Sequence, residues 1–253
     1  MLRLEQVSKT YGEGTRALRD VSLKIEAGEF VVILGKSGAG KSTLLRCINR
    51  LVEQTSGKIF FEDQEVTAMD GKRLRSLRQK IGMIFQDYNL VSRMSVRTKV
   101  LSGALGRTSA WAALVNYFSK DDIAAAQHHL EWLEIGDKAR QRADQLSGGQ
   151  QQRVGIARTL MQQPKIILAD EPVASLDPAT SRTILDILRR INREDGVTVL
   201  CNLHLPKLAR EYAQRLIAMK DGQIIYDGPP KALSTEMADR LHQVLVSKPG
   251  LQQ

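Results

Sequence analysis

Cysteine is scarce in this sequence, with only Cys47 and Cys201 among 253 residues. Neither belongs to a recognisable motif, so a disulfide framework or metal site finds no support, and we expect two buried small hydrophobic side chains. Long apolar runs are also missing, since FVVIL and IIL have the length of strands and cannot span a membrane. The N-terminus MLRLEQVSKTYGEG lacks the apolar core of a secretory signal. These absences favour a cytosolic protein.

Acidic residues are outnumbered, because 37 Lys and Arg face 28 Asp and Glu, for a net charge of +9. Such a charge suits nucleic acid, an anionic membrane surface or an anionic ligand. The basic residues are scattered, and the one dense run, KRLRSLRQK, is typical of a solvated helix surface. Charge alone therefore does not select a partner.

Hydrophobic periodicity predicts an α/β fold. Short strands are predicted over residues 1–34, ending in the buried run EFVVILG, and helical spacing follows over residues 41–52. Residues 88–162 carry several helical patterns and little strand signal, which indicates a helical lobe inserted into an α/β core. Strands and helices then alternate up to a hairpin at Asp221-Gly222, and the last twenty or so residues are expected to form an amphipathic helix and a polar end.

A glycine-rich loop over residues 35–43, GKSGAGKST, matches the phosphate-binding pattern G-x-x-x-x-G-K-S/T at every fixed position. Its glycines let backbone N–H groups surround phosphate oxygens, and the following helix adds its positive end. Lys41 is expected to reach the β- and γ-phosphates of a nucleotide, and Ser42 to ligate Mg²⁺. The predicted nucleotide-binding residues here are Gly35, Lys36, Ser37, Gly38, Ala39, Gly40, Lys41, Ser42 and Thr43.

Two consecutive acids follow a buried strand, KIILAD. Asp170 ends the strand, where a carboxylate can hold Mg²⁺ through its water shell. Glu171 comes next, where a base for an attacking water is needed. Together with the glycine-rich loop, these acids predict a nucleotide-phosphate site with Mg²⁺, without deciding which acceptor receives the phosphate.

A second helix start, LSGGQQQRVGIARTL, also has the features of an anion site. Ser147 is the expected cap, and Gly148 and Gly149 open their amides in front of the helix, followed by Gln150. The first loop already covers one face of a nucleotide, so this second loop is useful only if it closes over the other face. If a helical lobe holds it too far away, a second copy of the chain must supply it.

These motifs, with ILADEP, SLDP and the later His204, resemble the ATP-binding subunit of ABC transporters over nearly the whole chain. The resemblance implies a phosphate-loop nucleoside-triphosphatase core with an N-terminal antiparallel β subdomain and an inserted helical subdomain. It implies one domain over residues 1–253, with core and β subdomain in 1–87 and 163–230, the helical subdomain in 88–162, and a C-terminal helix and tail in 231–253. In that family two copies sandwich two ATP molecules head to tail.

The resemblance also implies roles for individual residues. Tyr11 matches the aromatic residue that stacks on adenine, and Gln86 matches the glutamine that senses Mg²⁺ and the attacking water. Glu171 matches the catalytic base, and Asp177 in SLDP matches the acid that links the two copies. His204 matches the histidine that contacts the γ-phosphate.

Within the family, the segment after Gln86 and the run GALGR resemble the phosphonate importer branch. This implies a peripheral subunit on the cytoplasmic face of the inner membrane, a pair of transmembrane permease subunits, and indirect dependence on an external binding protein. Arg97-Thr98-Lys99 depart from the family pattern, as do Asn202 and Pro206. None of these departures is expected to touch a position that contacts ATP.

Two other functions are compatible with part of the sequence. A non-transport ATPase of the same type, serving a phosphonate-degrading complex or a nucleic-acid-linked machine, is kept open by the positive charge, although nucleic acid is not the expected partner. A phosphate-loop kinase shares the first loop but has no use for LSGGQ or His204.

Overall fold

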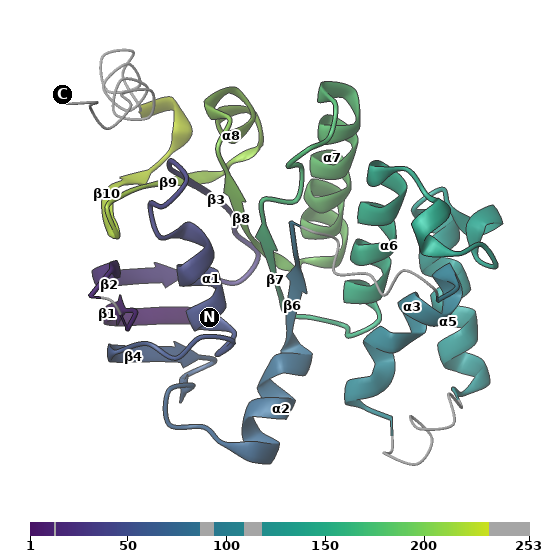
Figure 1. The fold of residues 1–253 in the computed structure, drawn as a ribbon, viewed down its shortest axis with the longest axis horizontal. Coiled ribbons are helices and arrows are strands. Elements are labelled where there is room, and N and C mark those ends of the chain that lie inside the picture. Colours follow the sequence, from purple (N-terminus) through teal and green to yellow (C-terminus); the bar gives the residue numbers. More distant parts are fainter. Residues whose placement is uncertain (13, 87–93, 109–117, 233–253) are drawn as a thin grey trace.

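The computed structural model describes residues 1–12, 14–86, 94–108 and 118–232 of the chain (Figure 1). The helix predicted at the C-terminal end lies outside these residues, as does part of the stretch that follows GALGR. No helix in the described part is both long and apolar enough to cross a membrane.

A six-stranded sheet forms the centre of the fold, in the order β10-β9-β3-β8-β7-β6. Five of its strands run parallel and the edge strand β10 pairs antiparallel with β9. The strands are β3 (Phe30–Leu34), β6 (Ile81–Ile84), β7 (Ile166–Asp170), β8 (Thr198–Leu203), β9 (Arg215–Lys220) and β10 (Gln223–Gly228). The central strands β3, β7 and β8 are buried throughout, which explains their continuous apolar runs.

A second, antiparallel sheet is built from the N-terminal part of the chain, in the order β2-β1-β4-β5. Its strands are β1 (Leu2–Thr10), β2 (Arg16–Ile25), β4 (Ser56–Phe61) and β5 (Gln64–Glu65). Helix α1 (Lys41–Ile48) packs between the two sheets, because its buried residues share one apolar cluster with the inward side chains of β1, β2 and β4 and with Val31 and Ile33 of β3. The predicted α/β fold is confirmed.

The opposite face of the six-stranded sheet is covered by helices. Phe30, Val32 and Leu34 of β3 point to that face and join a second cluster with the helices there. These helices are α3 (Val96–Leu101), α5 (Lys120–Trp132), α6 (Gly148–Leu160), α7 (Pro178–Asp195) and α8 (Pro206–Tyr212), with the short 3₁₀ turns Ser102–Gly106, Gly136–Lys138 and Ala143–Gln145 between them. In Figure 1, α3, α5 and α6 lie at the end of the molecule farthest from β1 and β2.

The basic run KRLRSLRQK forms α2 (Gly71–Lys80), which precedes β6. Lys72, Arg73 and Arg75 are exposed, as the charge pattern indicated. Arg78 is half-buried and donates to the Asn49 and Arg50 carbonyls, so part of the run holds the chain after α1. A last 3₁₀ turn, Pro230–Ala232, ends the described chain.

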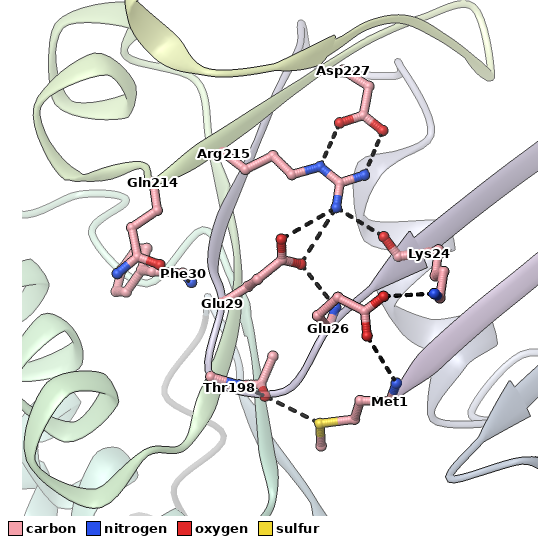
Figure 2. Close-up of polar contacts among 10 residues, drawn as sticks. Met1, Lys24, Glu26, Glu29, Phe30, Thr198, Gln214, Arg215 and Asp227 are labelled. Carbon is pink, nitrogen blue, oxygen red and sulfur yellow. Dashed lines mark hydrogen bonds and ion pairs between the residues drawn. The ribbon is translucent and has the colours of Figure 1, made fainter.

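A polar network joins the two sheets at the N-terminal end of β3 (Figure 2). Arg215 at the start of β9 makes two bonds to Asp227 of β10, at 2.6 and 2.7 Å, and also donates to the Lys24 carbonyl at the end of β2, at 2.9 Å. The same guanidinium lies 3.3 Å from Glu29, whose carboxylate accepts the Glu26 N–H. The paired carboxylate of Asp227 raises the pKa of Arg215. One side chain therefore fixes how the antiparallel sheet meets the central sheet.

Candidate active site

The glycine-rich loop connects the end of β3 to the start of α1, and two of its glycines cannot be replaced without movement. Gly40 has φ 98° and is the N-cap of α1, and a Cβ there would lie 2.3 Å from the Ala17 carbonyl oxygen. A Cβ at Gly35 would lie 2.6 Å from the Met219 carbonyl oxygen. The loop thus packs closely against both β2 and β9, and these two contacts fix the orientation of its backbone amides.

Lys41, the first residue of α1, is buried beneath this loop with 4% of its surface exposed. Its Nζ donates to the Gly35 and Lys36 carbonyl oxygens, at 2.8 and 3.0 Å. The ammonium also lies 3.4 Å from Glu171 Oε1. These partners hold the cation at the centre of the loop, where a phosphate would meet it.

Ser42 and Asp170 meet at the carboxyl end of β7. Ser42 Oγ donates to Asp170 Oδ1 at 2.7 Å, and Asp170 is only 3% exposed. A hydroxyl and a carboxylate are the oxygen ligands that Mg²⁺ prefers, and this cation commonly takes one or two protein oxygens and completes its shell with phosphate and water. In the described part of the chain there is no cluster of three or more His, Cys, Asp or Glu that could hold a metal alone. The pair fits a magnesium ion shared with a nucleotide.

Glu171 follows directly and lies between the side chains of Lys41 and His204. It has φ 51°, a left-handed conformation that is rare for a residue with a side chain. Its Oε2 lies 3.5 Å from Nδ1 of His204, and its Oε1 faces Lys41. His204 follows β8, the neighbour of β7 in the sheet. The carboxylate of Glu171 is 17% exposed, so a water can reach it.

Two further predicted residues lie near this centre. Gln86 is exposed two residues beyond β6, and β6 pairs in parallel with β7 through Ile84 and Ala169, so Gln86 follows the same edge of the sheet as Asp170. Tyr11 is 41% exposed and its hydroxyl lies 3.4 Å from Thr43 Oγ1. Tyr11 therefore contacts the end of the glycine-rich loop.

The LSGGQ segment begins α6 with a reciprocal pair of hydrogen bonds. Ser147 Oγ accepts the Gln150 N–H at 3.4 Å, and Gln150 Oε1 accepts the Ser147 N–H at 3.0 Å. No hydrogen bond or ion pair between described residues joins Ser147–Gln150 to the glycine-rich loop. Helix α6 also packs on the opposite face of the central sheet from α1. Among the described residues, the LSGGQ segment thus lies apart from the glycine-rich loop of its own chain.

Contacts within the chain constrain Gly149 and Asp177. A Cβ at Gly149 would lie 2.4 Å from Thr180 Cγ2, so the start of α6 touches the start of α7. Asp177 is the N-cap of α7 and accepts the Ala179 and Thr180 N–H groups, each at 3.0 Å. Hydrogen bonding at Thr180 lowers the pKa of Asp177. Sequence reasoning missed Thr180, because nothing in its spacing signals a contact with the distant LSGGQ segment.

One contact was not expected from the sequence. Asn202, which departs from the family pattern, lies against a predicted Mg²⁺ ligand, because its Nδ2 donates to Asp170 Oδ1 at 2.9 Å. The register of β7 against β8 pairs Asp170 with Asn202, which places the two side chains together. Only the strand pairing reveals this contact.

The two cysteines are wholly buried as expected, and burial raises the pKa of the Cys47 thiol to about 11.

Comparison with known proteins identifies the family. A family model described as ABC transporter matches residues 18–174. The phosphonates import ATP-binding protein PhnC 3 of Halalkalibacterium halodurans is 52% identical over 96% of this chain and 94% of its own length. The corresponding PhnC protein of Bdellovibrio bacteriovorus is 51% identical, over 96% and 93%. A solved ATP-binding cassette, MJ0796, in a dimeric post-hydrolysis state with ADP and Pi, has a TM-score of 0.81 at 36% identity, covering 91% of this chain and 99% of its own. This chain belongs to the ABC transporter family and has the fold of its ATP-binding cassettes.

Proposed function

We propose that this chain is the ATP-hydrolysing subunit of an importer for phosphonate or a related phosphorus oxyanion. Relatives named as phosphonates import ATP-binding proteins are 52% and 51% identical to it, which supports the substrate class. The observation that carries the ATPase activity is the position of Glu171, 3.4 Å from the Lys41 ammonium and 3.5 Å from His204 Nδ1. A base between two groups that bind phosphate is the arrangement that hydrolysis of a γ-phosphate requires.

The chain's own residues divide the work. The amides of residues 35–43 and the Lys41 ammonium bind the β- and γ-phosphates, and Tyr11 stacks on the adenine. Ser42, Asp170 and Gln86 would hold Mg²⁺, and the bound cation would neutralise charge on the phosphates.

Hydrolysis proceeds by in-line attack of water on the γ-phosphorus. Glu171 orients the water and takes its proton as the new P–O bond forms and the bond to the β–γ bridging oxygen breaks. Lys41, His204 and the Ser147–Gly149 amides of a second copy stabilise the charge on the γ-phosphate. Asp177 lies where the two copies meet head to tail.

The partners follow from this role. The subunit does not touch the transported substrate. Two copies of it dock on a pair of transmembrane permease subunits, and an external binding protein delivers the substrate to that permease. It is a peripheral protein on the cytoplasmic face of the inner membrane. Nucleic acid is not a partner.

Glu171→Gln tests the catalytic role. We expect this variant to bind ATP, to lose hydrolysis, and to accumulate as a closed dimer, because the amide cannot accept the proton of water. Glu131→Gln, an exposed acid on α5, is the matched control and should hydrolyse ATP normally. Normal turnover by Glu171→Gln would contradict the assignment.

Growth on single phosphorus sources tests the transport role. A strain that lacks this chain should fail to grow on a phosphonate yet grow on inorganic phosphate, and the wild-type chain should restore growth. Unimpaired growth on phosphonates would contradict the substrate class. Co-purification with a soluble enzyme complex, and with no permease, would contradict transport itself.

A further inference from the structure

Asn202 is a wholly buried amide, next to last in the largely apolar strand β8. Its neighbours in β8, from Val199 to Leu203, are apolar and buried as well. Its Nδ2 donates to Asp170 Oδ1 at 2.9 Å, while its Oδ1 is buried with no hydrogen-bond partner among the described residues. The amide is therefore only half satisfied.

A half-satisfied amide is costly in a protein core. Burying a polar atom without a partner destabilises the folded state, and a β-branched apolar residue would suit this position of the sheet better. Asn192 in α7 shows the contrasting case, because its Nδ2 donates to the Gly28 and Val197 carbonyls and its Oδ1 accepts from Gln214. Stability explains Asn192 but not Asn202.

The contact of Asn202 with Asp170 offers the other explanation. Asp170 Oδ1 accepts two hydrogen bonds, from Asn202 Nδ2 and from Ser42 Oγ, which fix the rotation of the carboxylate. Oδ2 then faces away from these donors, with Arg46 Nη2 at 3.8 Å. A carboxylate held in one orientation is prepared to bind a metal shell without losing further freedom.

We propose that Asn202 is a positioning residue that holds Asp170 in the orientation that binds the magnesium shell. This rests on the proposed Mg²⁺ site. Asn202 is next to last in β8 and His204 directly follows that strand, so β8 places one side chain against Asp170 and one against Glu171. Asn202 acts on metal affinity, whereas His204 acts on the reacting phosphate.

The test measures metal binding without turnover. Mn²⁺ binding to the ATP-loaded protein is followed by electron paramagnetic resonance in a Glu171→Gln background, and Mg²⁺ competition gives the affinity of the natural ion. We expect Asn202→Val to weaken metal binding by about tenfold, the lower end of the effect of outer-shell partners. Asn202→Thr has nearly the shape of Asn202→Val but carries a hydroxyl donor, so it should recover part of that loss. Asn192→Val is the matched control, and should lower the free energy of unfolding while leaving metal affinity unchanged.

The outcomes separate this inference from the metal site on which it rests. If Asp170→Asn weakens Mn²⁺ binding and Asn202→Val does not, Asn202 has no positioning role. If neither variant weakens it, the magnesium site itself is wrong. Equal losses in Asn202→Val and Asn192→Val would show a general effect of buried amides and overturn the inference. If the β-branched variants do not fold, Asn202→Ser and Asn202→Ala make the same comparison of a donor with no donor.

Discussion

The contact between the starts of α6 and α7 can be broken by adding one methyl group. A Cβ at Gly149 would lie 2.4 Å from Thr180 Cγ2, about 1 Å short of an ordinary carbon–carbon contact. Overpacking of this kind costs about 1–3 kcal/mol, so we expect Gly149→Ala to lower the free energy of unfolding by about 2 kcal/mol. Gly155, in the same helix, has room for a methyl group, because a Cβ there would meet nothing within 4 Å. Gly155→Ala should therefore stabilise the protein by about 0.5–1 kcal/mol.

Urea unfolding followed by far-UV circular dichroism measures both effects. Thr180→Ser removes the methyl group that the new Cβ would meet, so the double variant with Gly149→Ala should recover at least half of the lost stability. A Gly149→Ala variant as stable as Gly155→Ala would refute the reasoning. So would a double variant whose losses simply add, because the two residues would then not be in contact.

Two further predictions concern basic side chains, Lys99 and Arg215. Lys99 is 3% exposed with no hydrogen-bond partner for Nζ, and burial lowers its pKa, with Arg158 adding to the effect and Asp144 opposing it. The folded state thus binds fewer protons than the unfolded state between the lowered pKa and the ordinary 10.5. Lys99→Met should raise the free energy of unfolding by about 1–3 kcal/mol at pH 7. This gain should shrink as the pH rises from the lowered pKa of Lys99 to 10.5, because the folded wild-type protein then carries a neutral lysine. A lower free energy of unfolding in the variant would contradict this prediction. Arg215→Met should lower the free energy of unfolding by about 2 kcal/mol, and the melting temperature with it, because it removes charged hydrogen bonds to Asp227 and the Lys24 carbonyl. An unchanged free energy of unfolding would show that this network does not stabilise the fold.

Several elements of the candidate nucleotide site could be predicted from the sequence because their signals are local. Gly40 has φ 98°, a left-handed conformation that the turn from the loop into α1 requires, and Asp170 ends a strand whose apolar run is visible in the sequence. Each of these signals depends on neighbours within a few residues. Strand and helix positions followed for the same reason, since side-chain periodicity is a local property.

Contacts between distant segments could not be predicted. The bond from Asn202 to Asp170 depends on the register of β8 against β7, and the approach of Gly149 to Thr180 depends on how two helices pack. Lys99 gives no sign of burial in the sequence, because a lysine in a short helix is ordinarily solvated. These residues are set by tertiary packing, which composition and spacing do not record.

The central claim is that each ATP is held by Lys41 of one copy and by Ser147 of the other, and mixed dimers test it most directly. One chain carries Lys41→Ala and the other carries Ser147→Arg, and each is inactive alone. In a head-to-tail dimer of the two, both defects fall in one site and the other site is intact, so an equal mixture should regain about a quarter of the wild-type ATPase rate. If each site were built within a single chain, the mixture would stay as inactive as its components, and the account would be wrong.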